Sequence, residues 1–348
     1  MTILVTGASG HLGANLVRRL LDDGHSLRVL LREGSNNAAV DGLNVEKVYG
    51  DLRDFTKIKA AVKGCNQIYH CAAKVSTLDG NPILEREIYD TNVLGTLHIL
   101  QAALEYGISK VVVSGSFSAV GHNPEKPSNE TVPFYPFSPH LPYGFSKTFV
   151  EHECLKAFAN GLNVVVAVSC AILGPNDYKP SRMGRTLIDF ANGKLPAYVP
   201  GGFEFVAAKD IVEGHILAMS KGRPGQKYIF SSQFLTVDEL MDIFEEVTNR
   251  DRPHLRIPSA MMAGIAGVAD FILPRFFPKV PRRFTSGAVR ILRMHRHADI
   301  SKAKNELGYK PTSIKASIQS AYDDFLCRGL ITPVEKRITF THSKEKLS

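Results

Sequence analysis

Short apolar runs alternate with amphipathic stretches along the first half of the chain. Runs rich in β-branched and aromatic residues predict buried strands, and apolar residues at three- and four-residue spacing predict helices. The predicted strands lie at 2–6, 26–32, 45–50, 66–73, 110–116 and 161–170, and the predicted helices lie at 11–24, 54–63, 85–106 and from about 143. Strands alternating with helices require crossover connections, so the pattern predicts an α/β fold with a doubly wound parallel sheet.

The pattern changes near Gly174. Glycine and proline become frequent there, in stretches such as GPNDYKPSRMG and NGKLPAYVPGG, and longer loops separate the helices. Such punctuation marks a different local architecture. We therefore expect a sheet domain over 1–173, a smaller lobe over 174–330 that returns to the sheet in places, and a polar tail over 331–348.

A glycine-rich loop follows the first predicted strand. In VTGASGHLG, Gly7, Gly10 and Gly13 are spaced G-x-x-G-x-x-G. Between a strand and a helix, the first glycine permits a tight turn and the second lets backbone N–H groups approach a pyrophosphate. The third allows close packing of helix on strand. The loop predicts that residues 1–173 form a Rossmann-type dinucleotide-binding domain.

The end of the second predicted strand bears on which dinucleotide binds. A carboxylate there would bind the ribose 2′-hydroxyl of NAD. The chain has Leu31 instead, followed by Arg32, whose planar guanidinium suits a phosphate. NADP(H) is therefore favoured, and the neighbouring Glu33 leaves NAD(H) open. Asp51, after the third strand, is placed either to meet the adenine or to cap the next helix.

The sequence YGFSK carries the candidate chemistry. It places Tyr143 and Lys147 four residues apart, on one face of the predicted helix. A phenol titrates near pH ~10, and a neighbouring ammonium, helped by an oxidised nicotinamide, lowers that pKa. Ser116, at the end of a predicted strand, offers a hydroxyl to the substrate oxygen. These residues predict proton exchange with a carbonyl or an alcohol during hydride transfer.

With these motifs and TNVLGT, VAAKDIVEGHILAM and KNELGYKP, the chain resembles the extended short-chain dehydrogenases/reductases over about residues 1–325. It is most similar to the dihydroflavonol-4-reductase-like and 3β-hydroxysteroid dehydrogenase-like group, and MGRTLIDFANGKLPAYVPGG is similar to proteins labelled hopanoid-associated sugar epimerases. The resemblance implies that Tyr143 is the general acid/base and that Lys147 lowers its pKa and holds the nicotinamide ribose. It also implies that Ser116 orients the substrate, that Asn92 supports a proton relay, and that Arg32 contacts the NADP 2′-phosphate. A homodimer through the helices before and after the fifth strand is expected by resemblance.

We expect the cofactor to lie where the glycine loop, the strand ends and the Tyr143 helix meet. The expected contacts are Gly7, Ser9, Gly10, His11, Leu12, Gly13, Arg32, Asp51, Leu52, Ala72, Ala73, Lys74, Tyr143, Lys147 and Ser169. Ser169 stands where members of the group often have a proline, a departure that concerns the nicotinamide end of the site.

The substrate is expected over Ser116 and Tyr143, beneath the second lobe. The residues expected to line its pocket are Val75, Phe117, His140, Tyr178, Arg182 and Met183. The segment FYPFSPHLPYG is rich in aromatic residues and proline, which suits a stiff apolar wall. An ordinary loop packed on the helix is the alternative interpretation.

The positive charge is concentrated near the C-terminal end. The segment from Arg275 to Lys310 holds ten Lys or Arg against two acidic residues, which matches the net charge of +8. With the apolar run AMMAGIAGVADFIL before it, segment 260–297 is a candidate for peripheral contact with an anionic membrane. A solvated helix face, or a helix over an apolar pocket, is the alternative. No nucleic-acid-binding motif accompanies the segment, so we expect no nucleic-acid partner.

The cysteines and the first residues of the chain indicate the cellular compartment in which the protein is expected. The five cysteines form no C-x-x-C pair, and the histidines of the basic run lack nearby Cys or carboxylate ligands, so we expect no disulfide and no metal site. The start, MTILVTG, enters a strand directly and has no signal-peptide pattern. A cytoplasmic protein, with membrane association as an addition, is the expectation.

The sequence thus predicts an NADP(H)-dependent oxidoreductase that interconverts a ketone and a secondary alcohol on a largely apolar small molecule, such as a steroid-, flavonoid- or acyl-ketone-like compound. The alternative is a nucleotide-sugar epimerase or dehydratase with tightly bound NAD, in which Arg182 and Arg185 hold a pyrophosphate. A non-catalytic dinucleotide-binding protein is the third possibility.

Overall fold

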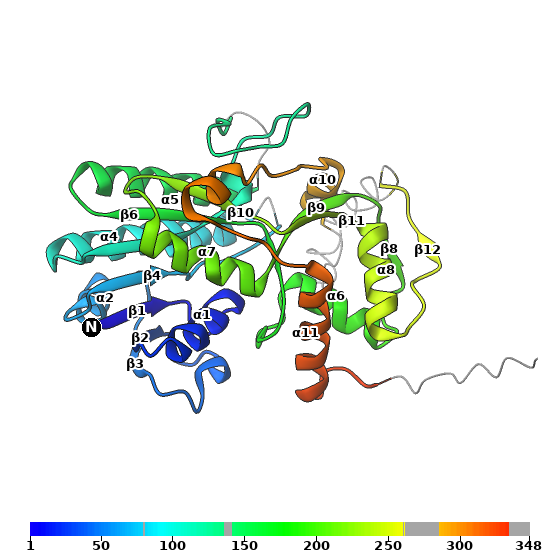
Figure 1. The fold of residues 1–348 in the computed structure, drawn as a ribbon, viewed down its shortest axis with the longest axis horizontal. Coiled ribbons are helices and arrows are strands. Elements are labelled where there is room, and N and C mark those ends of the chain that lie inside the picture. Colours follow the sequence, from blue (N-terminus) through cyan, green and yellow to red (C-terminus); the bar gives the residue numbers. More distant parts are fainter. Residues whose placement is uncertain (79–80, 136–140, 260, 262–284, 334–348) are drawn as a thin grey trace, which may run out of the picture.

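A seven-stranded parallel sheet forms the centre of the computed structural model, which describes residues 1–78, 81–135, 141–259, 261 and 285–333 (Figure 1). The strand order is β10-β6-β5-β4-β1-β2-β3. The strands are β1 (Thr2–Thr6), β2 (Ser26–Leu31), β3 (Glu46–Tyr49), β4 (Gln67–His70), β5 (Lys110–Ser116), β6 (Val164–Ser169) and β10 (Lys227–Phe230). The six predicted strands and the doubly wound fold class are confirmed. The apolar pattern does not single out β10, which is only four residues long.

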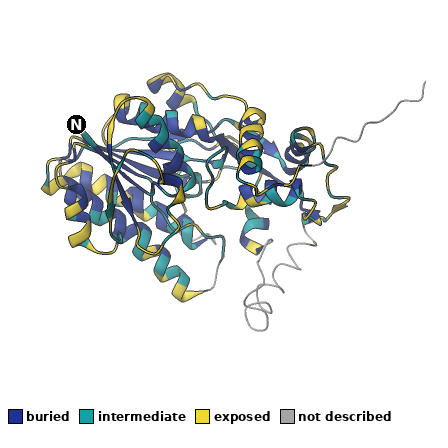
Figure 2. Cartoon of the chain, turned by 90° about the horizontal axis from the view of Figure 1, so that it is seen from below, coloured by how far each residue is buried: buried dark blue, intermediate teal, exposed yellow. Residues whose placement is uncertain are grey.

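Helices cover both faces of this sheet. On one face α1 (His11–Asp22) packs against α7 (Ala208–Lys221), and on the other α4 (Gly95–Glu105) packs between α2 (Phe55–Val62) and α5 (Pro142–Ala159). A buried sheet covered on both faces needs apolar residues throughout its strands, and β1, β5 and β6 meet this demand. Figure 2 shows the buried sheet between helices whose outer faces are exposed.

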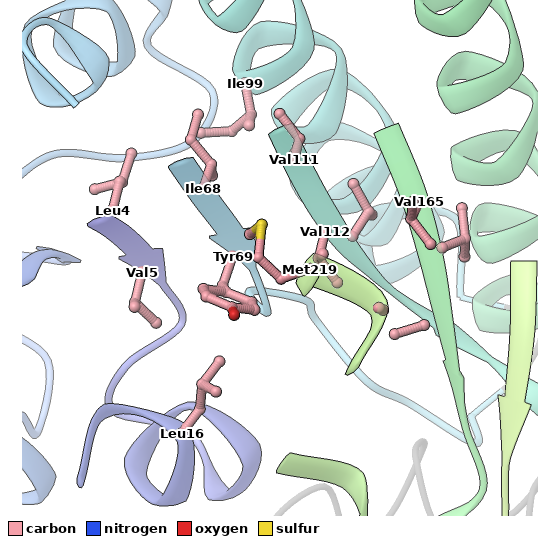
Figure 3. Packing of buried hydrophobic residues seen from close by; sticks show 14 of the residues in the cluster. Leu4, Val5, Leu16, Ile68, Tyr69, Ile99, Val111, Val112, Val165 and Met219 are labelled. Atoms are coloured by element: carbon pink, nitrogen blue, oxygen red, sulfur yellow. The ribbon is translucent and has the colours of Figure 1, made fainter. Parts of the chain in front are cut away.

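Neighbouring residues of each strand contribute to opposite faces of the core. Leu4 points toward Ile99 of α4, whereas the next residue, Val5, points toward Leu16 of α1 (Figure 3). All four side chains are at most 1 % exposed. This alternation fixes the register of the strands, because a slip by one residue would exchange the two faces.

The predicted helix at 85–106 is interrupted. It consists of α3 (Pro82–Tyr89), a π-helical turn η2 (Asp90–Leu94) and α4. The side chain of Asn81 caps α3 by accepting a hydrogen bond from the backbone N–H of Leu84 at 3.1 Å. The π-turn carries the buried Asn92, one of the predicted catalytic residues.

A second hydrophobic core lies beside the carboxyl edge of the parallel sheet (Figure 1). Its elements, here called the second unit, are β7 (Ala171–Leu173), α6 (Arg182–Ala191), β8 (Ala197–Tyr198), β9 (Gly202–Ala207), β11 (Gln233–Thr236), α8 (Val237–Thr248), β12 (Leu255–Arg256), α10 (Ser286–Arg293) and α11 (Ile314–Cys327). The strands form a three-stranded sheet, β11-β9-β7, and a β12-β8 pair. A capping box between Thr236 and Glu239 starts α8. Short helical turns η1 (Ala38–Val40), η3 (Phe117–Ala119) and η4 (Ala303–Leu307) complete the structure.

Some predicted features fall outside the described residues. His140, most of the proposed membrane-contact segment and most of the polar tail belong to this group. In the part of the chain that the structure describes, no helix combines the length and the apolar character needed to cross a bilayer. The same part contains no cluster of three or more His, Cys, Asp or Glu side chains suited to a metal ion.

The second core gives a stability prediction. Ile318 of α11 is 0 % exposed within that core, so Ile318→Ala should lower the free energy of unfolding by about 2–5 kcal/mol. Ile83→Ala is the matched control: Ile83 is 77 % exposed, and the expected change is below ~0.5 kcal/mol. Urea unfolding followed by circular dichroism measures both values. Equal losses would contradict the packing of α11 in the second core.

Candidate active site

The loop between β1 and α1 brings backbone atoms together so closely that glycine is required. Gly7 has φ +73°, and its carbonyl oxygen accepts a hydrogen bond from the N–H of Gly10 at 2.9 Å. A Cβ on Gly13 would lie 2.2 Å from that oxygen, and a Cβ on Gly7 would lie 2.6 Å from the nitrogen of Ala72. Gly10 precedes α1 and supplies no side-chain cap, so the first N–H groups of the helix are available to an anion.

This loop forms part of the wall of a cavity of about 420 Å³. The predicted cofactor contacts that line it are Gly7, Ser9, Gly10, Arg32, Asp51, Leu52, Ala72, Ala73 and Lys74. The lining residues that the sequence did not single out are Thr6, Leu30, Ser35, Gly50, Arg53, Cys71, Glu87, Thr91 and Lys179. The cavity lies beside a backbone cradle that any Cβ would fill, and this combination fits a ligand that contains a pyrophosphate.

Three predicted contacts lie behind the cavity wall. Gly13 packs on the carbonyl oxygen of Gly7, and the Leu12 side chain belongs to the main core. His11 points toward the second unit, where its Nε2 lies 3.1 Å from the carbonyl oxygens of Gly174 and of Pro175. Since both partners are acceptors, this nitrogen carries the proton. These residues therefore shape the loop rather than line the cavity.

Cationic side chains gather at the cavity near the end of β2. Leu31 is buried in the main core, whereas the exposed Arg32 lines the cavity. Arg53 forms an ion pair with Asp51 at 2.8 Å, and this hydrogen-bonded guanidinium lowers the pKa of the Asp51 carboxyl. Within the described part of the chain, Arg32 has no carboxylate partner. The charge of Arg32 also lowers the pKa of Asp51, but the carboxylate is hydrogen-bonded to Arg53 and leaves the Arg32 guanidinium available to a ligand.

Ser116, Tyr143 and Lys147 come together at the carboxyl end of β5. Burial raises the pKa of the Tyr143 phenol, and a hydrogen bond with Ser116 opposes this rise. Lys147 donates a hydrogen bond to the carbonyl oxygen of Ser114 at 2.7 Å, and burial lowers its pKa to about 8. The sequence predicts a lowered Tyr143 pKa. Among the protein's own groups, burial has the larger effect, and the pKa is raised. Ser169 pairs with Ser116 in the β5–β6 register.

Asn92 holds the wall of the cavity to the Tyr143 helix. Its Oδ1 accepts a hydrogen bond from the N–H of Lys74 at 2.7 Å, and its Nδ2 donates to the carbonyl oxygen of Lys74 and to Ser146 Oγ. Ser146 in turn donates to the carbonyl oxygen of Tyr143 at 2.8 Å. Thr96 Oγ1 donates to the carbonyl oxygen of Asn92, within the π-helical region. The amide thus connects the segment after β4 with the start of α5.

A buried histidine lies behind the same wall and was not identified from the sequence. His70 Nδ1 is 2.7 Å from Thr6 Oγ1, and its Nε2 is 3.0 Å from Thr96 Oγ1. Burial lowers the pKa of His70 to about 3, so the ring is neutral at physiological pH. It joins β1, β4 and α4 without adding charge.

Comparisons with known proteins agree with this geometry. The model of the NAD dependent epimerase/dehydratase family matches residues 3–230. The chain belongs to this family. It is 43% identical to the sterol demethylase protein B of Methylococcus capsulatus, over 95% of this chain and 100% of that protein. It is 28% identical to the 3beta-hydroxysteroid-dehydrogenase/decarboxylase isoform 1 of Arabidopsis thaliana, over 82% of this chain and 68% of that protein.

A solved structure extends the likeness to the whole fold. The crystal structure of gox2253 is 30% identical, with a TM-score of 0.82 over 95% of this chain and 99% of that one. Together with the family match, these findings confirm the resemblance to extended short-chain dehydrogenases/reductases. The chain is an NAD(P)-dependent dehydrogenase/reductase.

Two aromatic residues predicted to line the substrate pocket of this family member are engaged with arginines. The Tyr178 ring lies between Arg18 and Arg328, whose guanidinium carbons are 5.2 and 4.7 Å from the ring centre. Tyr178 is therefore packed against α1 rather than facing the described cavity. The Phe117 ring lies under the guanidinium of Arg296, 4.4 Å away.

The other predicted substrate contacts have different surroundings. Val75 is 68 % exposed, and Met183 packs against the second core. Arg182 donates a hydrogen bond to Thr77 Oγ1, and burial lowers the pKa of its guanidinium. His140 lies outside the described residues, and none of the other five lines the dinucleotide cavity.

One residue of the basic segment supports the loop that follows Ser116. Arg296 Nη2 donates to the carbonyl oxygens of Phe117, Val120 and Gly121 at 3.2, 2.8 and 3.1 Å. Burial lowers the pKa of this guanidinium to about 10, which leaves it charged at neutral pH. Since these carbonyls lie between one and five residues after Ser116, Arg296 fixes the backbone beside the proposed catalytic hydroxyl. At least one cation of the charged segment is thus internal.

Proposed function

We propose that the protein is an NADP(H)-dependent oxidoreductase that interconverts a ketone and a secondary alcohol on a largely apolar, ring-containing molecule. The observation that carries the proposal is the meeting of Ser116, Tyr143 and Lys147 at the sheet edge that also forms the glycine-lined cavity. A proton donor, a hydroxyl that positions the substrate and a buried ammonium are the groups that carbonyl reduction requires.

Tyr143 acts as the proton donor in the reducing direction. Its pKa is raised by burial, so the phenol is protonated at neutral pH. Ser116, hydrogen-bonded to the phenol, holds the substrate oxygen beside it. When bound, the nicotinamide supplies the hydride for reduction and accepts it in the opposite direction. Tyr143 then gives its proton to the oxygen that acquires negative charge.

Lys147 positions this machinery and adds a positive charge. Its hydrogen bond to Ser114 ties α5 to β5, two residues before Ser116. The buried ammonium would meet little solvent screening, so it favours a phenolate or an alkoxide over the neutral form. Asn92 keeps the segment after β4 in register with α5.

The preference for NADP(H) rests on Arg32. Its guanidinium lines the cavity next to the end of β2, where a carboxylate would favour NAD. A guanidinium binds a phosphate through parallel charge-assisted hydrogen bonds. Asp51 lies close enough to feel the charge of Arg32, but its carboxylate is hydrogen-bonded to Arg53, so the Arg32 guanidinium is free to bind a phosphate.

The apolar substrate class is supported by the relatives. The relative from Methylococcus capsulatus is named a sterol demethylase protein, and the relative from Arabidopsis thaliana is named a 3beta-hydroxysteroid-dehydrogenase/decarboxylase. We propose a sterol-like ketone or secondary alcohol, whose rings would contact the apolar side chains around the catalytic loop.

The alternative is a nucleotide-sugar epimerase or dehydratase, which the family description includes. Such an enzyme would keep NAD tightly bound. The arginines available for a pyrophosphate are Arg182, which contacts Thr77, and Arg185, which donates to the carbonyl oxygen of Pro180 at 3.0 Å. Arg32 at the end of β2 favours the NADP(H) reductase instead.

The proposal includes a homodimer through α3, α4 and α5. Large apolar side chains on these helices are exposed by 38 to 52 %: Tyr89, Leu104, Phe149, Leu155 and Phe158. Tyr89 of α3 and Phe149 of α5 contact each other edge to face, with ring centres 6.1 Å apart. Exposed apolar side chains that contact each other, as Tyr89 and Phe149 do, are typical of a protein–protein interface.

The first prediction concerns the catalytic hydroxyl. Tyr143→Phe should reduce kcat by about 10²- to 10⁴-fold while leaving dinucleotide affinity unchanged, because it removes only the proton donor. Reduction of a panel of steroid ketones with NADPH, followed at 340 nm, measures kcat. Tyr49→Phe is the control, because Tyr49 is exposed on β3. Unchanged turnover in Tyr143→Phe would exclude the proposed acid.

The second prediction concerns cofactor choice. Arg32→Leu should weaken NADPH binding by about 10- to 100-fold, the effect of losing a charged hydrogen bond, and should leave NADH binding unchanged. Fluorescence titration of each cofactor measures the two affinities. Stoichiometric NAD retained through purification, together with no NADPH preference, would favour the epimerase alternative.

The third prediction concerns the apolar helix face. Phe149→Arg should convert a dimer into monomers, because it replaces an exposed apolar ring, in contact with Tyr89, by a charge that the interface would bury. Leu255→Arg is the matched control: Leu255 is 58 % exposed on β12, away from this face. Sedimentation velocity measures the masses. A monomeric unmutated protein at micromolar concentration would contradict the dimer.

A further inference from the structure

A lysine from the second unit reaches into the dinucleotide cavity. Lys179 follows β7 in the chain and lines the cavity together with Arg32. Its Nζ lies 3.1 Å from Ser9 Oγ in the glycine loop and 3.0 Å from Ser35 Oγ in the loop after β2. One ammonium thus connects the two loops that form this part of the cavity.

The charges around Lys179 are unbalanced. Arg32 is near enough to lower the pKa of Lys179, in addition to the larger lowering by burial. The nearby Arg53 is already paired with Asp51. In the chain segments that the structure describes, neither Arg32 nor Lys179 forms an ion pair with a carboxylate. The acids that line the cavity, Asp51 and Glu87, are paired with Arg53 and Lys74. Two like charges without a carboxylate partner of their own are stabilised when an anion binds between them.

The segment that bears Lys179 is held firmly to α1. Asn15 Nδ2 donates to the carbonyl oxygen of Pro175 at 2.9 Å, and Asn176 Nδ2 donates to Asn15 Oδ1 at 3.0 Å. Asn176 adopts φ +61°, a left-handed conformation that asparagine tolerates. Arg18 donates to the hydroxyl of Tyr178, the residue before the lysine, at 3.0 Å. Lys179 is therefore placed over the cavity in advance, which reduces the entropy lost on binding.

We propose that Lys179 and Arg32 together bind the 2′-phosphate of an NADP-type dinucleotide, with Ser9 and Ser35 as further hydrogen-bond donors. This inference rests on the proposed NADP(H) preference and extends it to a residue of the second unit. A phosphate monoester carries a charge of about −1.5 to −2 at neutral pH, which matches the two cations. The guanidinium supplies a planar fork, and the ammonium supplies a point charge that can approach from the other side.

Ser9 in the glycine loop and Ser35 in the loop after β2 take part in the same phosphate site. Each hydroxyl now accepts a hydrogen bond from Lys179, and each retains a proton to donate to a phosphate oxygen. A dinucleotide without the 2′-phosphate would leave both cations uncompensated. Lys179 thus acts as a specificity residue for the phosphorylated cofactor, contributed from 147 residues beyond Arg32 in the chain.

The test compares two ligands that differ in the 2′-phosphate. Isothermal titration of the full-length protein with 2′,5′-ADP and with 5′-AMP measures binding without turnover. Lys179→Met should weaken 2′,5′-ADP binding by about 10-fold or more and leave 5′-AMP binding unchanged, because it removes a charged partner of that phosphate alone. Lys179→Arg should retain most of the affinity. Lys126→Met, at an exposed site in another loop, is the control for net charge.

The outcomes separate this inference from the proposed function. If the unmutated protein binds both ligands equally, the NADP(H) preference itself fails, and the inference fails with it. If the unmutated protein prefers 2′,5′-ADP but Lys179→Met keeps that preference, only the role of Lys179 is overturned. If Lys179→Met weakens both ligands equally, the lysine binds the phosphate common to both, and its 2′-phosphate role is also overturned. Circular dichroism of each variant verifies that the fold persists.

Discussion

The close approach of the Gly7, Gly13 and Ala72 backbones is the constraint on which the rest of the molecule depends. A side chain at either glycine would separate α1 from β1, or β1 from the segment after β4, because the nearest atoms belong to the backbone and cannot turn aside. Since the distances are this short, the N-terminus of α1 and the segment after β4 line one cavity. The cavity therefore follows from a local packing condition.

Burial determines the protonation of the titratable groups near the carboxyl ends of β4 and β5. It raises the pKa of Tyr143, lowers the pKa of Lys147 to about 8 and lowers the pKa of His70 to about 3. All three shifts favour the neutral form, because a buried charge loses the stabilisation of water. A neutral phenol and a neutral imidazole leave the Lys147 ammonium as the principal charge there.

The sequence could predict those parts of the fold and site that local patterns encode. Apolar runs located six strands of the main sheet, the glycine spacing located the cavity, and the four-residue spacing of Tyr143 and Lys147 placed both on α5. The π-turn at Asn92 was missed because five residues of ordinary helical composition carry no distinct period. The contact between Lys179 and Ser9 spans 170 residues and has no local signal. The fold alone brings such groups together.

Chain segments next to the second unit contact the site at two places, the glycine loop and the loop after Ser116. The second contact comes from the basic segment, which the sequence makes a candidate for membrane contact. Near the glycine loop, the chain after β7 is hydrogen-bonded to α1. Near Ser116, Arg296 donates hydrogen bonds to three backbone carbonyls, those of Phe117, Val120 and Gly121, instead of facing a membrane or another protein. A guanidinium can satisfy several carbonyl oxygens at once, because its donors are arranged in a rigid planar fork. A cluster of positive charge in a sequence therefore predicts a positively charged surface only after the buried cations of the cluster have been subtracted. In this protein at least one of them, Arg296, stabilises the loop after Ser116.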